Sequence, residues 1–349
     1  MPVDPQATIT LCVASGALTV RAWDKSEVRV RSNDAVQLEF RRIDKPRDPH
    51  TPATRVDVMV FDKTSRAPQP DCQAIADVDM DVPAGSTVQA QTRDGDISIV
   101  GIAGAYAGSQ NGDITIERVT KLVEAGSVGG SISLKDSSGR VNLNSAGGGV
   151  EAFNVRAASP EDTFEVGTVS GDIQLERIGT PKVLAKTVSG TLMMSGALIK
   201  SGYYSFTNVT GEIVLALPAD ASFRLSAKVS DKQDLVSDFP LKYTVESSPV
   251  PRGPRVLPPA PKPVESREPQ LPPDAAKQMK EKEKEKPAAK PAPPAKTPAP
   301  PKSGVMVTPA PPGRLIFVPV VRRIEAICGS GDATISVASF GGAVHLKKL

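Results

Sequence analysis

Apolar and polar residues alternate along the first part of the chain. Between residues 7 and 42, apolar side chains stand at every second position within short runs, as in Ile9, Leu11 and Val13. An alternation of period two is typical of β-strands that bury one face. It returns in residues 55–61 and 74–82, after a charged loop that contains prolines. The pattern therefore predicts a β-rich N-terminal region over residues 1–82.

A glycine-centred repeat begins after residue 87. Three copies superimpose almost residue for residue, Thr168–Leu175, Thr187–Met194 and Asn208–Leu215, and looser copies precede them. The anchor glycines recur at intervals of 17 to 23 residues; they are Gly95, Gly112, Gly130, Gly148, Gly171, Gly190 and Gly211. Such an interval is typical of one solenoid rung, and alternating residues ahead of each glycine supply a second strand. We predict a stack of rungs with at least two short strands each.

Stacking explains how a chain with few aromatic residues can fold. Aromatic residues make up 4% of the sequence, so the core must consist mainly of Val, Ile, Leu and Ala. Rungs bury such side chains by lying on one another. Glycine suits the corner because the chain needs either a positive φ or a close backbone contact there. We predict that the anchor glycines, Gly148 left aside, form one column along the stack.

A segment near the C-terminus has a different composition. Residues 249–312 hold 20 of the 33 prolines, no aromatic residue and the charge-alternating run Lys280–Lys286. This segment cannot bury enough apolar surface to offset its chain entropy, so we predict disorder with polyproline II character. Glycine repeats resume at 330–335 and 341–346, so the segment is an insertion. A spacer role is favoured over membrane-surface contact or Pro-rich docking.

These patterns predict an all-β fold. It is a β-solenoid or β-helix-like stack of short repeated strands, with an N-terminal β-rich cap and a long disordered Pro-rich insertion. The predicted divisions are the cap at 1–82, the solenoid repeats at 83–246, the disordered insertion at 247–313 and the final solenoid rungs at 314–349.

Charge and hydropathy argue against two classes of partner. Residues 249–312 hold 12 of the 42 basic and 6 of the 39 acidic residues, so acidic residues outnumber basic ones in the remainder by 33 to 30. A slightly acidic body is a poor surface for nucleic acid. No stretch approaches the roughly 18 apolar residues of a membrane span, and no signal-peptide pattern opens the chain. We expect a cell-envelope or extracellular location if a leader lies upstream, and a cytoplasmic one otherwise.

Cysteine and histidine form no catalytic pattern. Cys12, Cys72 and Cys328 are widely spaced and include no CxxC pair. We interpret them as small buried hydrophobic residues rather than as a disulfide or metal site. The odd count leaves at least one thiol free unless it pairs between chains. The two histidines, His50 and His345, are not expected to serve a nucleophile.

Repeated Gly-Asp pairs suggest a possible calcium site. Stacked aspartates at rung corners could ligate Ca²⁺ as they do in β-rolls. The pairs begin at Gly95, Gly112, Gly171 and Gly331. However, the position after the glycine also holds Ser, Thr and Glu, and β-roll repeats are only about nine residues long. We interpret the aspartates as turn caps.

Glu161, Asp162 and Glu165 form an acidic cluster beside an expected extended loop. Paired acids carry out catalysis in many glycoside hydrolases, but a solvated loop accounts for these residues equally well. The predicted sets of catalytic, cofactor-binding and metal-binding residues are therefore empty. We expect no cofactor and no enzymatic activity.

The order of the motifs resembles a known family. The resemblance rests on Gly16–Val30 with its Trp23, on the Ser-Gly-Asp-Ile repeats, on Ser237–Leu241, and on the closing glycine repeats. The chain is similar to the bacterial putative-adhesin family, a domain of unknown function, over nearly all its length apart from the insertion. The resemblance implies a β-helical or solenoid fold and a frequent cell-envelope setting. It implies no catalytic residues.

We therefore expect a non-enzymatic structural or adhesin-like interaction protein of the bacterial cell envelope that uses the β-solenoid surface as a binding platform. Its partner is expected to be a protein or a cell-surface glycan. One alternative is a self-assembling scaffold similar to bactofilins, and another is a carbohydrate-active β-helix enzyme. Strands at both ends of the stack favour a monomer or small oligomer.

Overall fold

The computed structural model describes residues 1–32, 36–45, 51–62, 72–230, 234–247 and 322–349. The predicted disordered insertion, apart from residue 247, lies outside the described residues, as do residues 314–321 of the predicted final rungs. The chain divides into two units, and the unit considered below comprises residues 1–250 and 319–349.

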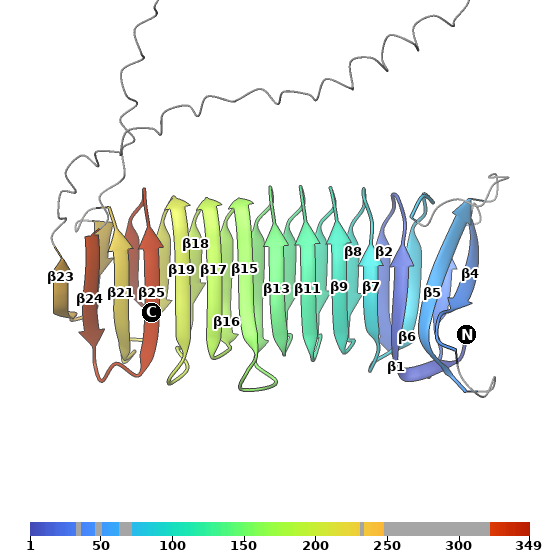
Figure 1. Cartoon of the computed structure of the whole chain (residues 1–349), viewed down its shortest axis with the longest axis horizontal. Coiled ribbons are helices and arrows are strands. Elements are labelled where there is room, and N and C mark those ends of the chain that lie inside the picture. Colours follow the sequence, from blue (N-terminus) through green and yellow to red (C-terminus); the bar gives the residue numbers. More distant parts are fainter. Residues whose placement is uncertain (33–35, 46–50, 63–71, 231–233, 248–321) are drawn as a thin grey trace, which may run out of the picture. The chain divides into compact units, whose positions relative to one another are not determined.

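This unit is built from two β-sheets, which we call the long sheet and the short sheet (Figure 1). The long sheet has 14 strands in the order β23 (Lys242–Ser247), β24 (Arg322–Cys328), β21 (Phe223–Val229), β25 (Ala333–Ser339), β19 (Tyr203–Thr210), β17 (Lys182–Ser189), β15 (Thr163–Ser170), β13 (Arg140–Ser145), β11 (Leu122–Ser127), β9 (Gly104–Ser109), β7 (Thr87–Gln91), β1 (Val3–Cys12), β5 (Ala53–Asp62) and β4 (Val36–Arg42). The short sheet has 12 strands in the order β22 (Leu235–Ser237), β26 (Val344–Lys348), β20 (Ile213–Leu217), β18 (Leu192–Ser195), β16 (Ile173–Gly179), β14 (Val150–Arg156), β12 (Ile132–Lys135), β10 (Ile114–Glu117), β8 (Ile97–Val100), β2 (Leu18–Trp23), β6 (Val78–Pro83) and β3 (Arg29–Ser32).

Each rung contributes one strand to each sheet. From β7 and β8 to β19 and β20, successive rungs stack in sequence order, and neighbouring strands within each sheet pair in parallel. The predicted all-β, solenoid-like architecture is therefore confirmed.

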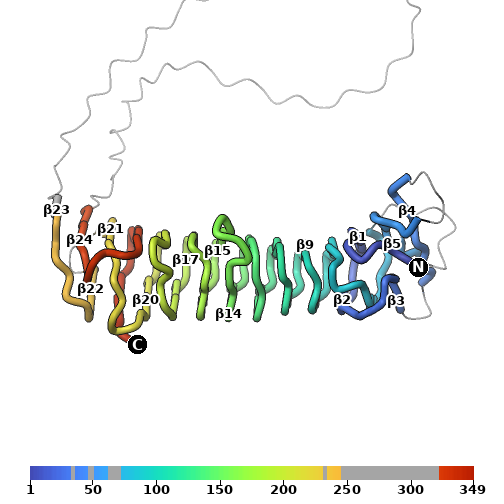
Figure 2. Tube along the Cα trace, turned by 90° about the horizontal axis from the view of Figure 1, so that it is seen from below, coloured from blue at the N-terminus to red at the C-terminus, as the bar shows by residue number. Residues whose placement is uncertain are grey.

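The order of rungs departs from the sequence at both ends of the stack (Figure 2). The β1/β2 rung lies between the β7/β8 rung and the β5/β6 rung, and β3 and β4 close that end as antiparallel strands. At the other end, the β25/β26 rung lies between the β19/β20 and β21/β22 rungs. Strand β24 pairs antiparallel with both β21 and β23. Residues 1–82 thus supply two rungs as well as two closing strands.

The core is a set of in-register ladders between the two sheets. In the short sheet, Ile97, Ile114 and Ile132 pair directly across neighbouring strands, and all three are buried. In the long sheet, the inward positions are small near β9, as at Ala105, and larger farther along, as at Phe164. Each fully buried aliphatic or aromatic side chain stabilises the fold by about 1.5–3 kcal/mol, so the ladders are the main stabilising element.

Candidate binding face

One corner of each rung is closed by the predicted column of glycines. A Cβ on Gly112 would lie 1.8 Å from the carbonyl oxygen of Gly95, and a Cβ on Gly130 would lie 2.1 Å from that of Gly112. The same contact continues through Gly148, Gly171, Gly190, Gly211 and Gly342. Close approach of neighbouring backbones, rather than φ, therefore requires glycine at Gly112 and Gly130.

Buried polar side chains bond to this glycine column. The Ser127 hydroxyl donates to the Gly112 carbonyl oxygen at 3.1 Å and accepts from the Gly130 amide at 2.9 Å. The equivalent donors to a glycine carbonyl in other rungs are Ser109, Ser145, Thr168, Thr187 and Asn208. Each rung is thereby tied to the one before it.

The aspartates of the Gly-Asp pairs bond to the next rung. Asp96 Oδ1 accepts from the Asp113 amide at 2.9 Å, and Asp113 Oδ1 accepts from the Ser131 amide at 2.7 Å. Asp172 Oδ1 likewise accepts from the Thr191 amide. Among the described residues, no group of three or more His, Cys, Asp or Glu side chains is placed to hold a metal ion.

The Gly331-Asp332 pair differs from the others. Gly331, with φ of 75°, lies in the turn before β25 in the long sheet, and the backbone oxygen of Asp332 accepts from Ser201. Gly342 is the residue that continues the glycine column. Residues 330–335 therefore resemble the repeat in sequence, but their glycine lies in a turn and not at a rung corner.

The interpretation of all three cysteines as buried hydrophobic residues was wrong for two of them. Cys12 and Cys72 form a disulfide, whereas Cys328 is free and buried. Burial raises the pKa of the Cys328 thiol and so favours its protonated form. Sequence reasoning missed the disulfide because the two residues are 60 positions apart and share no spacing motif.

The other residues with catalytic potential do not converge. His345 points outward from β26 opposite Val214, and His50 lies outside the described residues. Asp162 Oδ2 accepts from the amides of Ala158 and Ser159, so it caps the loop before β15. Glu165 lies on the exposed side of β15, where it pairs with Leu184.

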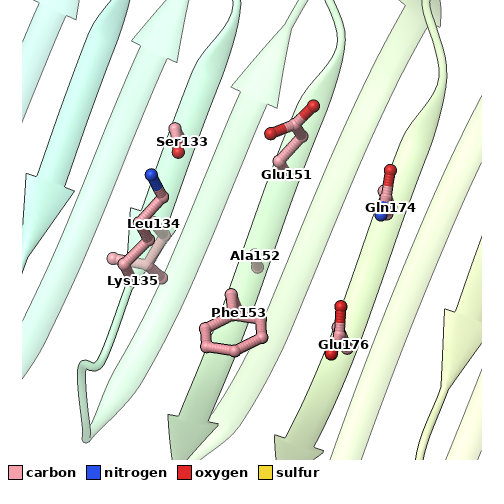
Figure 3. A pocket seen from close by; sticks show the side chains of 8 residues that line it. All are labelled: Ser133, Leu134, Lys135, Glu151, Ala152, Phe153, Gln174 and Glu176. Carbon is pink, nitrogen blue, oxygen red and sulfur yellow. The ribbon is translucent and has the colours of Figure 1, made fainter.

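The outer face of the short sheet has a shallow depression of about 170 Å³ over β12, β14 and β16 (Figure 3). Two in-register rows of outward side chains line it, Ser133, Glu151 and Gln174 in one, and Lys135, Phe153 and Glu176 in the other. Leu134 and Ala152 form its floor and belong to the buried core. The strands hold these side chains at fixed spacing because every position is defined by the ladder.

Arg177 lies next to the depression, at the adjoining corner. The Arg177 guanidinium stacks over the Phe153 ring at 3.9 Å from its centroid and lies 3.9 Å from the Glu176 carboxylate. Arg177 has a φ of 55°, and the left-handed conformation recurs at Arg118, Asp136 and Asn154 in neighbouring rungs. The Asn154 amide donates to Asp136 Oδ1 at 2.6 Å. This second corner carries side chains where the first carries none.

The depression combines polar, charged and aromatic side chains. Glu151, Gln174 and Ser133 offer hydrogen-bond acceptors and donors, and Lys135 offers a cation. The Phe153 ring adds an apolar surface.

The fold is a stack of parallel β-rungs. Residues 76–244 match the family model Toastrack DUF4097, a family whose function is unknown. The match confirms the resemblance to a family of unknown function, over a shorter range than the sequence repeats suggested.

Two other comparisons give little more. No curated protein matches the chain. A solved structure described as a putative cell adhesion protein from Clostridium sporogenes is 9% identical over 100% of this chain and 97% of that chain, with a TM-score of 0.19. That likeness is too low to support any inference about binding. The described part of the chain includes no helix long and apolar enough to cross a membrane.

Proposed function

We propose that the protein is a non-enzymatic interaction protein of the bacterial cell envelope whose short sheet binds a cell-surface glycan. The observation that carries the proposal is the depression around Phe153, where polar side chains from three neighbouring rungs stand in register. A sugar ring can lie against apolar side-chain surface while Glu151 and Gln174 bond to its hydroxyls.

The disulfide supports an envelope location. Disulfides persist in oxidising compartments and are rare in the reducing cytosol. Cys12 and Cys72 link β1 to the chain that leads into β6, so the bond fixes the rungs at the N-terminal end of the stack. An exported protein would gain this bond, whereas a cytosolic one would carry two thiols.

Binding of the full-length chain to an array of bacterial surface glycans tests the proposal. The variant Phe153→Ala/Gln174→Ala should lose at least about tenfold in affinity, because it removes apolar contact and hydrogen bonds together. A matched control is Tyr106→Ala/Gln89→Ala, on the outer face of the long sheet. Absence of glycan binding, or equal losses in both variants, would contradict the proposal.

Filament formation is the less favoured alternative. Both ends of the long sheet carry antiparallel strands, β4 at one end and the β23/β24 pair at the other. At the β3/β4 end, the edge strands of both sheets run antiparallel to the rungs, so a rung of a second copy cannot continue the parallel pairing there. We therefore expect light scattering of the intact chain to give the mass of a monomer or small oligomer.

A further inference from the structure

The outer face of the long sheet, opposite the candidate binding face, carries a regular set of cations. Strands β17, β19, β25 and β21 are neighbours there (Figure 1), and three rows of outward side chains cross them in register. The rows are Lys182, Tyr203, Thr334 and Arg224, then Leu184, Ser205, Ser336 and Ser226, then Lys186, Thr207, Ala338 and Lys228. We call Lys182, Lys186, Arg224 and Lys228, which stand at the corners of this array, the basic frame.

The dimensions of the basic frame follow from strand geometry. Lys182 and Lys186 are four residues apart on one strand, which corresponds to about 13 Å. Lys182 and Arg224 are separated by three strand spacings, which correspond to about 14 Å. These distances are too large for one small anion to bridge two corners, because a phosphate or carboxylate spans only a few ångströms. The frame therefore suits a ligand with several separated negative charges.

The four cations are exposed and are not neutralised by the described residues. None of them lies within ion-pair distance of a carboxylate in the described part of the chain. Glu165 stands beside the frame, opposite Leu184, and Asp332 lies in the turn before β25. Glu325 is already paired with Arg323 at 3.0 Å. No carboxylate occupies the three rows themselves.

This concentration of positive charge is local. Outside residues 249–312, acidic residues outnumber basic ones in the sequence by 33 to 30. On the short sheet, the outward residues of the matching rungs are Met193, Val214 and His345 in one row and Ser195, Ala216 and Lys347 in the next, so Lys347 is the cation among them. A cationic area on an otherwise slightly acidic body raises the local concentration of polyanions and orients them.

We propose that the basic frame binds a linear acidic polysaccharide. Its carboxylates pair with the four corner cations, and its sugar rings lie on the floor between them. That floor offers the Tyr203 side chain, which is 41% exposed, and the half-buried hydroxyls of Ser205 and Ser336. Single exposed ion pairs are weak, so affinity arises from several contacts made by one chain.

A polysaccharide fits this floor better than a membrane does. Peripheral membrane contact uses large apolar side chains that insert among the lipids next to the cations. Between the corners of the basic frame, Leu184 is half-buried, and the other floor residues apart from Tyr203 are small. Exposed apolar side chains, Val188, Val209 and Phe340, lie beyond the Lys186 row and outside the floor. Hydroxyls and one aromatic ring are instead the groups that recognise sugars.

Calorimetry of the full-length chain with short polygalacturonate chains tests the inference, with neutral maltooligosaccharides of equal length as the uncharged probe. The variant Lys182→Gln/Lys186→Gln/Arg224→Gln/Lys228→Gln should lower polygalacturonate affinity at least about tenfold and flatten its salt dependence. The control Arg93→Gln/Lys121→Gln/Arg156→Gln/Lys347→Gln removes equal charge elsewhere and should change affinity less than about twofold. Melting temperatures establish that both variants are folded.

Each alternative result would overturn the inference. Equal losses in the two variants would mean that only net charge matters, and equal binding of maltooligosaccharides would mean that the cations are not used. Binding to phosphatidylglycerol vesicles without binding to polygalacturonate would identify a lipid surface as the partner. The inference is independent of the proposed function, because Phe153→Ala/Gln174→Ala should leave polygalacturonate binding intact.

Discussion

The chain turns at two corners in each rung, and the backbone differs between the two corners. At the glycine corner, the Cα of Gly130 packs directly on the carbonyl oxygen of Gly112, so no side chain fits. At the opposite corner, Arg118, Asp136 and Asn154 hold left-handed backbone angles but still carry side chains. The first corner needs glycine for space, whereas the second tolerates other residues at an energetic cost. Substitutions should therefore have opposite effects at the two corners.

Adding one methyl group at the glycine corner should lower the free energy of unfolding more than any other change considered below. In Gly130→Ala, the new Cβ would lie 2.1 Å from the Gly112 carbonyl oxygen and 2.4 Å from its carbon. Backbone atoms cannot move aside without breaking the ladder, so we expect a loss of about 3 kcal/mol or more in unfolding free energy. Chemical denaturation measures this loss.

Gly126→Ala is the matched control for that substitution, because it lies in the same rung. A Cβ on Gly126 would meet its nearest neighbour, the Asn144 carbonyl oxygen, at 3.9 Å, which is ordinary contact. We expect this variant to remain within about 0.5 kcal/mol of the wild type. Similar losses in both variants would mean that the column does not depend on close packing.

Removing a buried hydroxyl at the same corner should cause the next largest loss of stability. Ser127→Ala leaves the Gly130 amide and the Gly112 carbonyl without the partner that joins them. An unsatisfied buried polar group costs about 1–3 kcal/mol, so stability should fall by that amount. The outward Ser98→Ala change on β8 serves as control. An unchanged melting temperature in Ser127→Ala would show that water replaces the hydroxyl.

The glycine corner could be predicted from sequence, whereas the second corner could not. The glycines recur at regular intervals in the sequence, and the absence of a Cβ explains why they allow close backbone contact. The left-handed positions carry Arg118, Asp136, Asn154 and Arg177, which share no chemistry, although Gly101 and Gly196 occupy the equivalent position in two other rungs. Their signal is positional, since each of them falls six residues after an anchor glycine.

The same positional signal applies to the candidate binding face. Ser133, Glu151 and Gln174 each follow an anchor glycine by three residues, and Lys135, Phe153 and Glu176 follow by five. Alignment of the repeats on glycine would have placed these residues in rows. The non-sequential order of the end rungs has no comparable signal, because strand order depends on pairing between segments such as β1 and β5.

Glycine should stabilise the second corner. Arg118 has a φ of 53°, and a left-handed conformation costs a residue with a Cβ roughly 1–2 kcal/mol. The exposed contact between Arg118 and Glu117, at 3.6 Å, contributes little. After the greater flexibility of glycine in the unfolded chain is counted, we expect Arg118→Gly to raise stability by about 0.5–1 kcal/mol. Arg118→Ala keeps the strained conformation and should not stabilise; equal stabilisation by alanine would exclude strain as the cause.

Calcium should change the stability of the protein least, although the glycine corner carries aspartates in neighbouring rungs. Asp96 and Asp113 each use Oδ1 to accept an amide from the next rung, so their role is to join backbones. Addition of millimolar calcium to the intact chain should therefore shift the melting temperature by less than about 1 °C, since a ligand that does not bind the folded state adds no stability. The triple variant Asp96→Asn/Asp113→Asn/Asp172→Asn retains a carbonyl acceptor at each position and should show the same response. A saturable calcium-dependent rise of several degrees in the intact chain, absent from the triple variant, would show that this corner binds metal as well as backbone.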